Sequence, residues 1–132
     1  MYTMKETCQK TGLAYETLKF YCNQGLVPNV KRDGLNHRVF DDRDVAWINS
    51  LTCLKQCDMG IVEMKEYLAL CQEGEETIPE RKRILEAKRR ALEGEQERIS
   101  QAIAYIDRKR DFYDDVLSGK RTYFSNLTAA ED

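Results

Sequence analysis

The hydrophobic pattern of the N-terminal part of the chain predicts two short helices joined by a tight turn. Helices are expected over residues 4–10 and 14–23, and Thr3 and Glu6 have the spacing of a capping box for the first of them. Gly12 lies between the two helices, and glycine readily adopts the positive φ that such a turn requires. Two short helices joined by a glycine-containing turn are typical of a helix-turn-helix motif.

The segment that follows, residues 26–40, is predicted to be irregular or extended, with the tip of a hairpin at residues 31–34. Asp41 and the acidic residues after it predict the start of a third helix, because carboxylates are favourable at the positive end of a helix. This helix should end near Cys57, and a fourth helix should cover residues 61–71.

The last predicted element is one long helix. Thr77 and Glu80 have the spacing of a capping box at its start, and beyond Pro79 no proline interrupts it before about Ser118. A helix of about 40 residues would be about 60 Å long at about 1.5 Å per residue. The small domain before it is too short to cover an apolar row of that length.

Apolar or aromatic residues recur every seven positions along this helix, and a partial second row lies four residues further on. A coiled coil with a partner chain is the simplest way to bury such a row. The predicted dimerisation residues are Leu85, Leu92, Ile99, Ile103, Ile106, Tyr113 and Leu117.

The net charge of the chain is −2, from 21 basic and 23 acidic residues, and this total does not indicate a nucleic-acid partner. The distribution of charge along the chain is uneven. Residues 1–47 carry seven Lys or Arg against six Asp or Glu, whereas residues 48–79 carry two against six. The predicted helix-turn-helix and hairpin therefore remain able to contact phosphate. Their basic residues are Lys19, Lys31, Arg32, Arg38 and Arg43.

All five cysteines, an odd number, lie within the first 71 residues. With no export signal visible at the N-terminus, this favours reduced thiols in the cytoplasm over a disulfide framework. No run of about 18 apolar residues is present, so we predict no membrane span. No nucleophile–base pair or phosphate-binding loop is recognisable, so the chain is not predicted to be an enzyme.

Several stretches of the sequence together resemble one known family. Residues 11–27 read TGLAYETLKFYCNQGLV, residues 36–40 read NHRVF, and residues 59–64 read MGIVEM. They are similar to the MerR family of bacterial transcription regulators, whose opening is TG-x-S-x-x-T-L-R-Y-Y-x-x-x-G-L and whose wing ends in N-G-Y-R-x-Y/F. The resemblance covers residues 1–70 by motif and residues 77–118 by architecture.

This resemblance implies a mainly α protein. A winged helix-turn-helix DNA-binding domain would occupy residues 1–75, and a dimerisation helix forming an antiparallel coiled coil would occupy residues 77–118. A short C-terminal tail would follow over residues 119–132. The resemblance also implies a homodimer that binds double-stranded promoter DNA with a long spacer. By bending and untwisting that DNA, the dimer would let RNA polymerase engage both promoter elements.

The family's DNA contacts can be carried over by position. The recognition helix of the family enters the major groove, and its wing arginine, matched here by Arg38, meets phosphate. Lys19 and Phe20 replace the arginine and the first tyrosine of the motif, and Ala14 replaces the serine that usually caps the helix. The predicted DNA-binding residues are Tyr15, Glu16, Thr17, Lys19, Phe20, Tyr21, Arg32, His37 and Arg38.

The cysteines bear on the signal that the protein senses. Metal-sensing relatives place thiolates at the start of the dimerisation helix and just after it, but no cysteine follows Cys71 and the single histidine, His37, lies in the wing. We therefore predict no metal site and no cofactor. Cys53 and Cys57 are one helical turn apart, and two soft ligands alone make a weak site.

A narrower similarity, to the subgroup of the family tied to aldehyde and thiol-reactive stress, includes Cys53 in the stretch CLKQCDMG of residues 53–60. It implies that the Cys53 thiolate attacks an electrophile. Packing of Cys53 in the core is an equally open alternative, and Cys8, Cys22 and Cys71 are expected to be buried structural residues.

Two other functions remain open for the chain as a whole. One is an effector-independent architectural or excisionase-like DNA binder. The other is a coiled-coil interaction module whose N-terminal domain binds protein instead of DNA. The basic hairpin next to Lys19 favours DNA binding over the second alternative.

Overall fold

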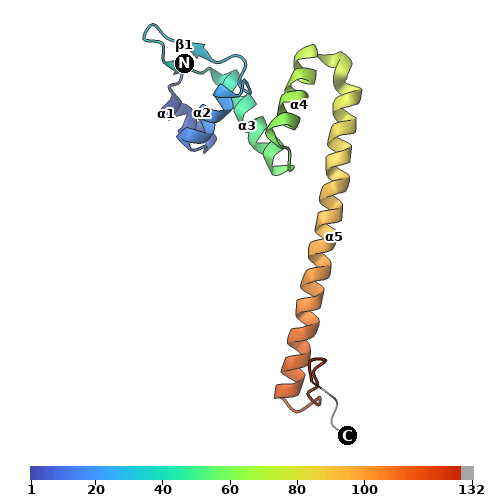
Figure 1. The fold of residues 1–132 in the computed structure, drawn as a ribbon. Helices are drawn as coiled ribbons and strands as arrows, with labels where there is room; N and C mark the ends of the chain where they lie inside the picture. The colour runs from blue at the N-terminus through green and yellow to red at the C-terminus, as the bar shows by residue number, and fades with distance from the viewer. Residues whose placement is uncertain (129–132) are drawn as a thin grey trace. The chain divides into compact units, whose positions relative to one another are not determined.

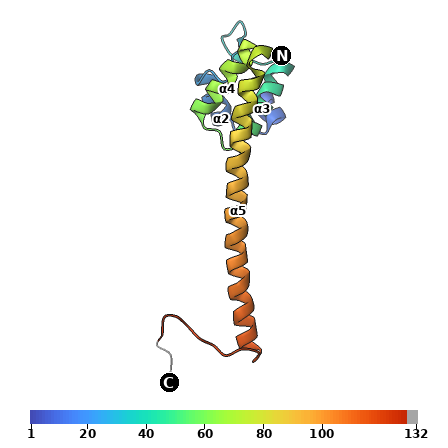
Figure 2. The same ribbon diagram turned by 90° about the vertical axis from the view of Figure 1, so that its right-hand side faces the viewer.

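A computed structural model describes residues 1–128 and shows a mainly helical fold with one β-hairpin (Figures 1 and 2). It has two compact parts, Met1–Arg89 and the chain from Arg90 onward, and each is described by itself below. In chain order the elements are α1 (Met4–Thr11), α2 (Tyr15–Asn23), β1 (Lys31–Arg32), β2 (Arg38–Val39), α3 (Asp42–Gln56), α4 (Ile61–Glu73), the 3₁₀ helix η1 (Glu75–Thr77) and α5 (Ile78–Leu117).

The ends of the first two helices follow from local side-chain chemistry. The Glu6 amide donates to Thr3 Oγ1 at 3.1 Å and the Thr3 amide donates to Glu6 Oε1 at 3.2 Å, which confirms the predicted capping box. Gly12 ends α1 with φ 74°, and its N–H donates to the Cys8 carbonyl at 2.8 Å. Ala14, at the start of α2, supplies no side-chain cap, as its residue type predicts.

The core of the N-terminal part lies among α2, α3, α4 and the segment after α2. Fully burying one large apolar side chain in this core contributes about 1.5–3 kcal/mol to the stability of the fold. Trp47 of α3 fixes the segment after α2, because its Nε1–H donates to the Leu26 carbonyl at 2.6 Å. The buried apolar residues are Leu18, Tyr21, Leu26, Val27, Phe40, Ile48, Leu51, Leu54, Met59, Met64 and Leu68.

The wing is a short antiparallel hairpin in which Lys31 pairs with Val39 and Arg32 pairs with Arg38. The predicted tip at residues 31–34 is wrong by a few positions, since the turn comprises residues 33–37. The reason is the Asp33 side chain, whose Oδ1 accepts the Leu35 and His37 amides at 2.9 Å each and so organises the turn around itself.

At the junction between α4 and α5, Thr77 makes other hydrogen bonds than those of the capping box predicted with Glu80. Thr77 Oγ1 instead donates to the carbonyls of Leu70 and Gly74, at 2.5 and 3.0 Å. Arg81 of α5 donates from Nε to Thr77 Oγ1 at 3.0 Å and from Nη2 to the Gly74 carbonyl at 2.6 Å. The start of the long helix is thus held by hydrogen bonds back to α4 and the connecting turn.

Helix α5 is 40 residues long, in agreement with the length expected from the sequence. Within the second part of the chain, the Phe124 ring packs edge-on against Phe112 of α5, with the ring centroids 5.1 Å apart. The predicted tail extends to residue 132, and its last four residues lie outside those described. Among residues 1–128, no helix combines the length and apolar character needed to cross a membrane.

Candidate nucleic-acid interface

Helix α2 presents an exposed face that carries most of the predicted recognition residues. Tyr15 is 53% exposed and Phe20 is 45% exposed, while Glu16 and Lys19 are exposed and Thr17 is half-buried. Residues four apart lie on the same face of a helix, so Tyr15 and Lys19 point in similar directions. The opposite face of the helix packs into the core through Leu18 and Tyr21.

Tyr21 does not fit its predicted role as a DNA contact. Its side chain is only 2% exposed, and its hydroxyl is buried without a hydrogen-bond partner in the part of the chain that the structure describes. The second aromatic residue of the pair therefore belongs to the core, and the preceding Phe20 is the one that reaches the surface.

Three predicted DNA contacts, Arg32, His37 and Arg38, lie in the wing turn and at the ends of its strands. Arg38 Nη2 donates to Asn23 Oδ1 at 2.6 Å, which ties the second strand to the end of α2. Arg32 Nη1 donates to the Asn36 carbonyl at 2.8 Å. The His37 side chain is 74% exposed, with its Nδ1 3.9 Å from Asp33 Oδ2. Asp33 has a lowered pKa, chiefly because its carboxylate accepts the His37 backbone N–H.

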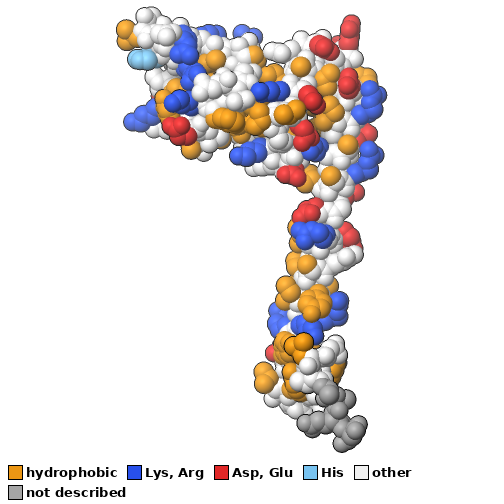
Figure 3. Space-filling view, in the orientation of Figure 1, with side chains coloured by type: hydrophobic (Ala, Val, Ile, Leu, Met, Phe, Trp, Pro, Cys, Tyr) orange, Lys and Arg blue, Asp and Glu red, His pale blue; other side chains and the backbone are white. Residues whose placement is uncertain are grey.

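A hollow of about 380 Å³ brings these distant segments of the sequence together. Tyr15 from α2 and Arg32, His37 and Arg38 from the wing line it. Lys5 from the first turn of α1 and the acidic Asp33 of the wing turn are also on its wall. Lys5 was not among the predicted site residues, because the hydrophobic pattern does not show which way α1 faces. Figure 3 shows Lys and Arg side chains, together with the histidine, gathered over this end of the N-terminal part.

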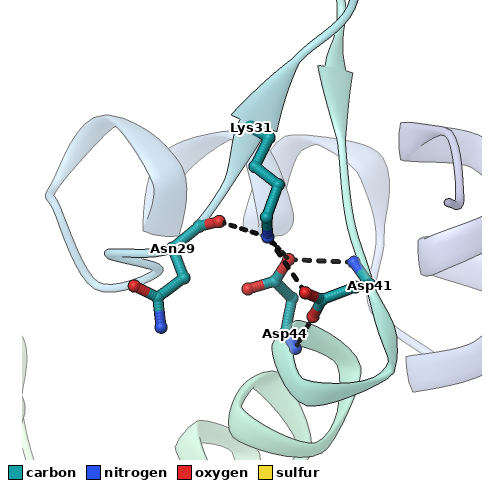
Figure 4. A network of polar contacts seen from close by, with 4 residues as sticks. All are labelled: Asn29, Lys31, Asp41 and Asp44. Carbon is teal, nitrogen blue, oxygen red and sulfur yellow. Dashed lines mark hydrogen bonds and ion pairs between the residues drawn. The ribbon is translucent and has the colours of Figure 1, made fainter.

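Lys31 has a different role from the one predicted from the basic hairpin (Figure 4). Its Nζ donates to the Asn29 carbonyl at 2.8 Å, to Asp41 Oδ2 at 3.0 Å and to Asp44 Oδ2 at 3.3 Å. Asp44 is only 3% exposed. Lys31 therefore holds the first wing strand against the start of α3, and its charge is paired with two carboxylates instead of being directed at phosphate.

The carboxylates of this cluster also cap α3. Asp41 Oδ1 accepts the Asp44 amide at 2.8 Å, and Asp44 Oδ2 accepts the Asp41 amide at 2.9 Å. The hydrogen bond from the Asp44 amide, followed by the contact with Lys31, lowers the pKa of Asp41 to about 2. The Asp41 carboxylate correspondingly raises the pKa of Lys31. The Asp-x-x-Asp spacing was the sequence signal from which this arrangement could have been found.

Cys53 is exposed on α3, so the alternative that it packs in the core is wrong. The other four cysteines are half-buried instead of fully buried. Burial raises the pKa of Cys22 above its usual value, and burial likewise raises the pKa of Cys8. Within residues 1–128, no group of three or more His, Cys, Asp or Glu side chains is arranged to hold a metal ion.

The predicted dimerisation residues all lie on α5 with much of their surface uncovered. Their exposed fractions range from 39% at Leu85 to 86% at Leu117. Ile99, near the middle of the row, is 45% exposed and Ile106 is 61% exposed. A row of large apolar side chains on a long helix is typical of a coiled-coil surface.

The fold and this surface together identify the class of protein. A helix-turn-helix followed by a β-hairpin wing, with further helices behind it and a long C-terminal helix, is a winged helix-turn-helix protein. A family model described as "MerR HTH family regulatory protein" matches residues 2–71, and the chain belongs to this family. The MerR family consists of transcriptional regulators and not of enzymes.

Relatives and solved structures agree with this assignment. An uncharacterized HTH-type transcriptional regulator of Haemophilus influenzae is 31% identical over 85% of this chain and 83% of its own length. The HTH-type transcriptional regulator AdhR of Bacillus subtilis is 34% identical over 66% of this chain and 62% of its own length.

Two crystal structures are also similar. HiNmlR, described as a MerR family regulator lacking the sensor domain, bound to promoter DNA, shares 30% identity with a TM-score of 0.73, covering 89% of this chain and 93% of its own. A MerR family regulator from Listeria monocytogenes, described as putative in that structure, shares 29% identity with a TM-score of 0.79 and 90% coverage of both chains.

Proposed function

We propose that this chain is a homodimeric regulator that binds promoter DNA through α2 and the wing. The observation that carries the proposal is the hollow where Tyr15 of α2 meets Arg32, His37 and Arg38 of the wing. Cations at the edge of a recognition helix supply phosphate contacts, which position such a helix in the major groove. Lys19 on the exposed face of α2 adds another cation at the same surface.

The similarity to HiNmlR supports this reading, because that structure is described as bound to promoter DNA and its alignment covers most of both chains. The shared architecture suggests the same use of the N-terminal part here. We further propose that the dimer distorts promoter DNA with a long spacer, so that RNA polymerase engages both promoter elements. The protein would then work in the cytoplasm, where its five free thiols stay reduced.

The exposed row on α5 supports the homodimer. Leu92, Ile99 and Ile106 are between 40% and 61% exposed, and an antiparallel partner helix would cover them. Two copies of the DNA-binding part would then face two half-sites of one operator. A homodimer therefore links the long helix to the DNA surface.

We also propose that Cys53 responds to electrophiles or thiol stress. Its exposure gives a reagent access, and AdhR, at 34% identity, is a relative in the region that includes this cysteine. In the simplest reaction the Cys53 thiolate adds to the β-carbon of an α,β-unsaturated aldehyde. A C–S bond forms as the C=C π bond breaks, and the displaced electron pair moves to the carbonyl oxygen to give an enolate. Water then protonates the α-carbon, the carbonyl re-forms and hydroxide is left.

The DNA-binding proposal is tested by titrating the chain with labelled DNA from its own upstream region and with unrelated DNA of equal length. Tighter binding to the upstream DNA is expected, with an affinity that falls as salt is raised. Equal and weak binding to both would favour the alternative of a coiled-coil protein-interaction module.

The sensor proposal is tested by transcription in vitro with and without an α,β-unsaturated aldehyde. Wild type should change its output, Cys53→Ser should not, and Cys57→Ser, a thiol one helical turn away and half-buried, serves as the matched control. An unchanged response in Cys53→Ser would reject the sensor. Specific binding with no response to any reagent would favour an effector-independent architectural or excisionase-like binder.

A further inference from the structure

A cavity of about 420 Å³, widely open to solvent, lies between α2 and the turn that joins α3 to α4. One wall is made by Glu16, Thr17, Phe20 and Tyr21 of α2. Cavities that bind small molecules usually measure about 300–1,000 Å³, so this one has the volume for a ligand of modest size. It is separate from the hollow between α2 and the wing, which lies beside the other predicted DNA contacts.

The opposite wall is apolar and adaptable. Met59 and Met64 both line the cavity and are 3% and 1% exposed. Methionine is unbranched and polarizable, so its side chain can adjust to ligands of different outline. The cavity therefore favours a mainly apolar molecule.

The polar groups on the wall restrict the ligand further. Tyr21 lines the cavity, and its buried hydroxyl has no hydrogen-bond partner among the described residues. Leaving such a hydroxyl unpaired is unfavourable by about 1–3 kcal/mol, so a ligand acceptor that displaces the side chains now covering it and reaches it gains affinity.

The charges on the wall are balanced. Lys55 is the basic residue and Glu16 the acidic residue that line the cavity, so their formal charges cancel. A cation or an anion would meet one like charge and one unlike charge, whereas a neutral molecule meets no repulsion. The wall thus favours a neutral ligand that carries a hydrogen-bond acceptor.

We propose that this cavity binds a small neutral molecule with an apolar body and one carbonyl oxygen, and that its occupancy alters DNA affinity. The second half rests on the proposed function, because Glu16, Thr17 and Phe20 belong both to the cavity wall and to the predicted DNA contacts. Lys65 Nζ donates to Gln24 Oε1 at 2.9 Å and ties α4 to the C-terminal end of α2. The ligand would therefore act on the earlier turns of α2.

The binding half is tested without DNA, on the full chain labelled with ¹³C at the methionine methyl groups. Of the four methionines, Met59 and Met64 line the cavity, while Met1 and Met4 do not and serve as internal controls. The probes share one skeleton: 2-phenylacetamide is neutral, phenylacetate is an anion and 2-phenylethylamine is a cation. For probes of about ten non-hydrogen atoms a Kd on the order of millimolar is expected.

Two variants and one matched control test the site and its hydroxyl separately. A Cβ added at Gly60 meets no atom within 4 Å, and φ −80° suits any residue, so Gly60→Leu can place a side chain at the cavity without strain. Gly34→Leu in the wing turn, where a Cβ also meets no atom within 4 Å, is the matched control. Tyr21→Phe removes only the unpaired hydroxyl.

The proposal predicts saturable shifts of the Met59 and Met64 methyl signals with 2-phenylacetamide, weaker shifts with both charged probes, and none in Gly60→Leu. Tyr21→Phe should weaken the binding of the amide several-fold, while Gly34→Leu should bind it as wild type does. Unmoved Met59 and Met64 signals with all three probes would overturn the site. Equal affinity for a charged probe would overturn the ligand class.

The coupling half is tested by titrating upstream DNA with and without 2-phenylacetamide. A several-fold change in DNA affinity is expected in wild type and none in Gly60→Leu. Methyl shifts without a change in DNA affinity would overturn the coupling. Methyl shifts in a chain that binds no DNA specifically would instead overturn the proposed function and leave the ligand site standing.

Discussion

Replacing Ile99 by alanine should weaken the homodimer by a predictable amount. Ile99 lies in the apolar row of α5 and is 45% exposed. The substitution removes three carbon groups, each worth about 0.8 kcal/mol when fully buried, or about 2.4 kcal/mol in all. Since roughly half of the side chain is already covered within its own chain, a partner can bury only the rest, which is worth roughly 1 kcal/mol.

A twofold dimer contains the substitution twice, so roughly 2 kcal/mol is lost and the dissociation constant of the dimer should rise about 30-fold. Alanine has the higher helix propensity, so a loss of helix cannot account for such weakening. Sedimentation equilibrium over a range of concentrations measures the constant, and far-UV circular dichroism checks the helix content.

Gln101→Ala is the matched control for this measurement. Gln101 is exposed and lies about 200° around the helix from Ile99, outside the apolar row. Its substitution should leave the dissociation constant within about twofold of the wild-type value. Equal weakening by both substitutions, or a wild-type chain that stays monomeric at high micromolar concentration, would refute the reasoning about the row.

Three further predictions concern the N-terminal part. Asp44→Ala removes half of a capping box and a partner of Lys31, and it should lower the free energy of unfolding in urea by about 1–2 kcal/mol; a loss below about 0.3 kcal/mol would count against the cluster. The pKa of Asp41 is lowered from 3.8 to about 2, so its contribution to stability is present above about pH 3.8 and is lost as the pH falls through about 2. Asp41→Asn should therefore flatten the decline in stability that urea unfolding measures across that pH interval. Tyr21→Phe should leave the free energy of unfolding in urea unchanged or raise it by up to about 1 kcal/mol. A marked loss of stability would show that the hydroxyl is hydrogen-bonded after all.

Local chemistry made the helices predictable from the sequence. Thr3 and Glu6, then Gly12, fix the first helix through contacts at most a few residues apart, and the structure has each of them. The length of α5 followed from the absence of helix-breaking residues and from the spacing of its apolar row. The class of fold was therefore accessible from local signals together with the family resemblance.

The errors arose where tertiary contacts decide the role of a side chain. Lys31 looked like a free cation in the sequence, but Asp44, thirteen residues away, pairs with it. Tyr21 was expected to contact DNA, but packing among α2, α3 and α4 buries its side chain. Exposure of Cys53 was not readable either, because helical spacing alone does not show which face of α3 the core covers.

The candidate DNA surface was predictable in part. The resemblance named residues of α2 and of the wing, and the structure brings Tyr15, Arg32, His37 and Arg38 around one hollow. Lys5 and the contact between Arg38 and Asn23 were missed, since both depend on how separate elements pack. Whether these side chains meet DNA stays a prediction.

The affinity of Arg38→Ala for DNA from the chain's own upstream region tests the central claim most directly. Arg38 is held by Asn23 at the hollow, whereas Arg83 of α5 is an exposed arginine outside it, so Arg83→Ala controls for the change in charge. Binding is measured by fluorescence anisotropy at several salt concentrations. Loss of one phosphate contact per subunit should weaken specific binding about tenfold or more and reduce the salt slope by about two per dimer, with Arg83→Ala close to wild type. Unchanged affinity and salt slope in Arg38→Ala would contradict the account.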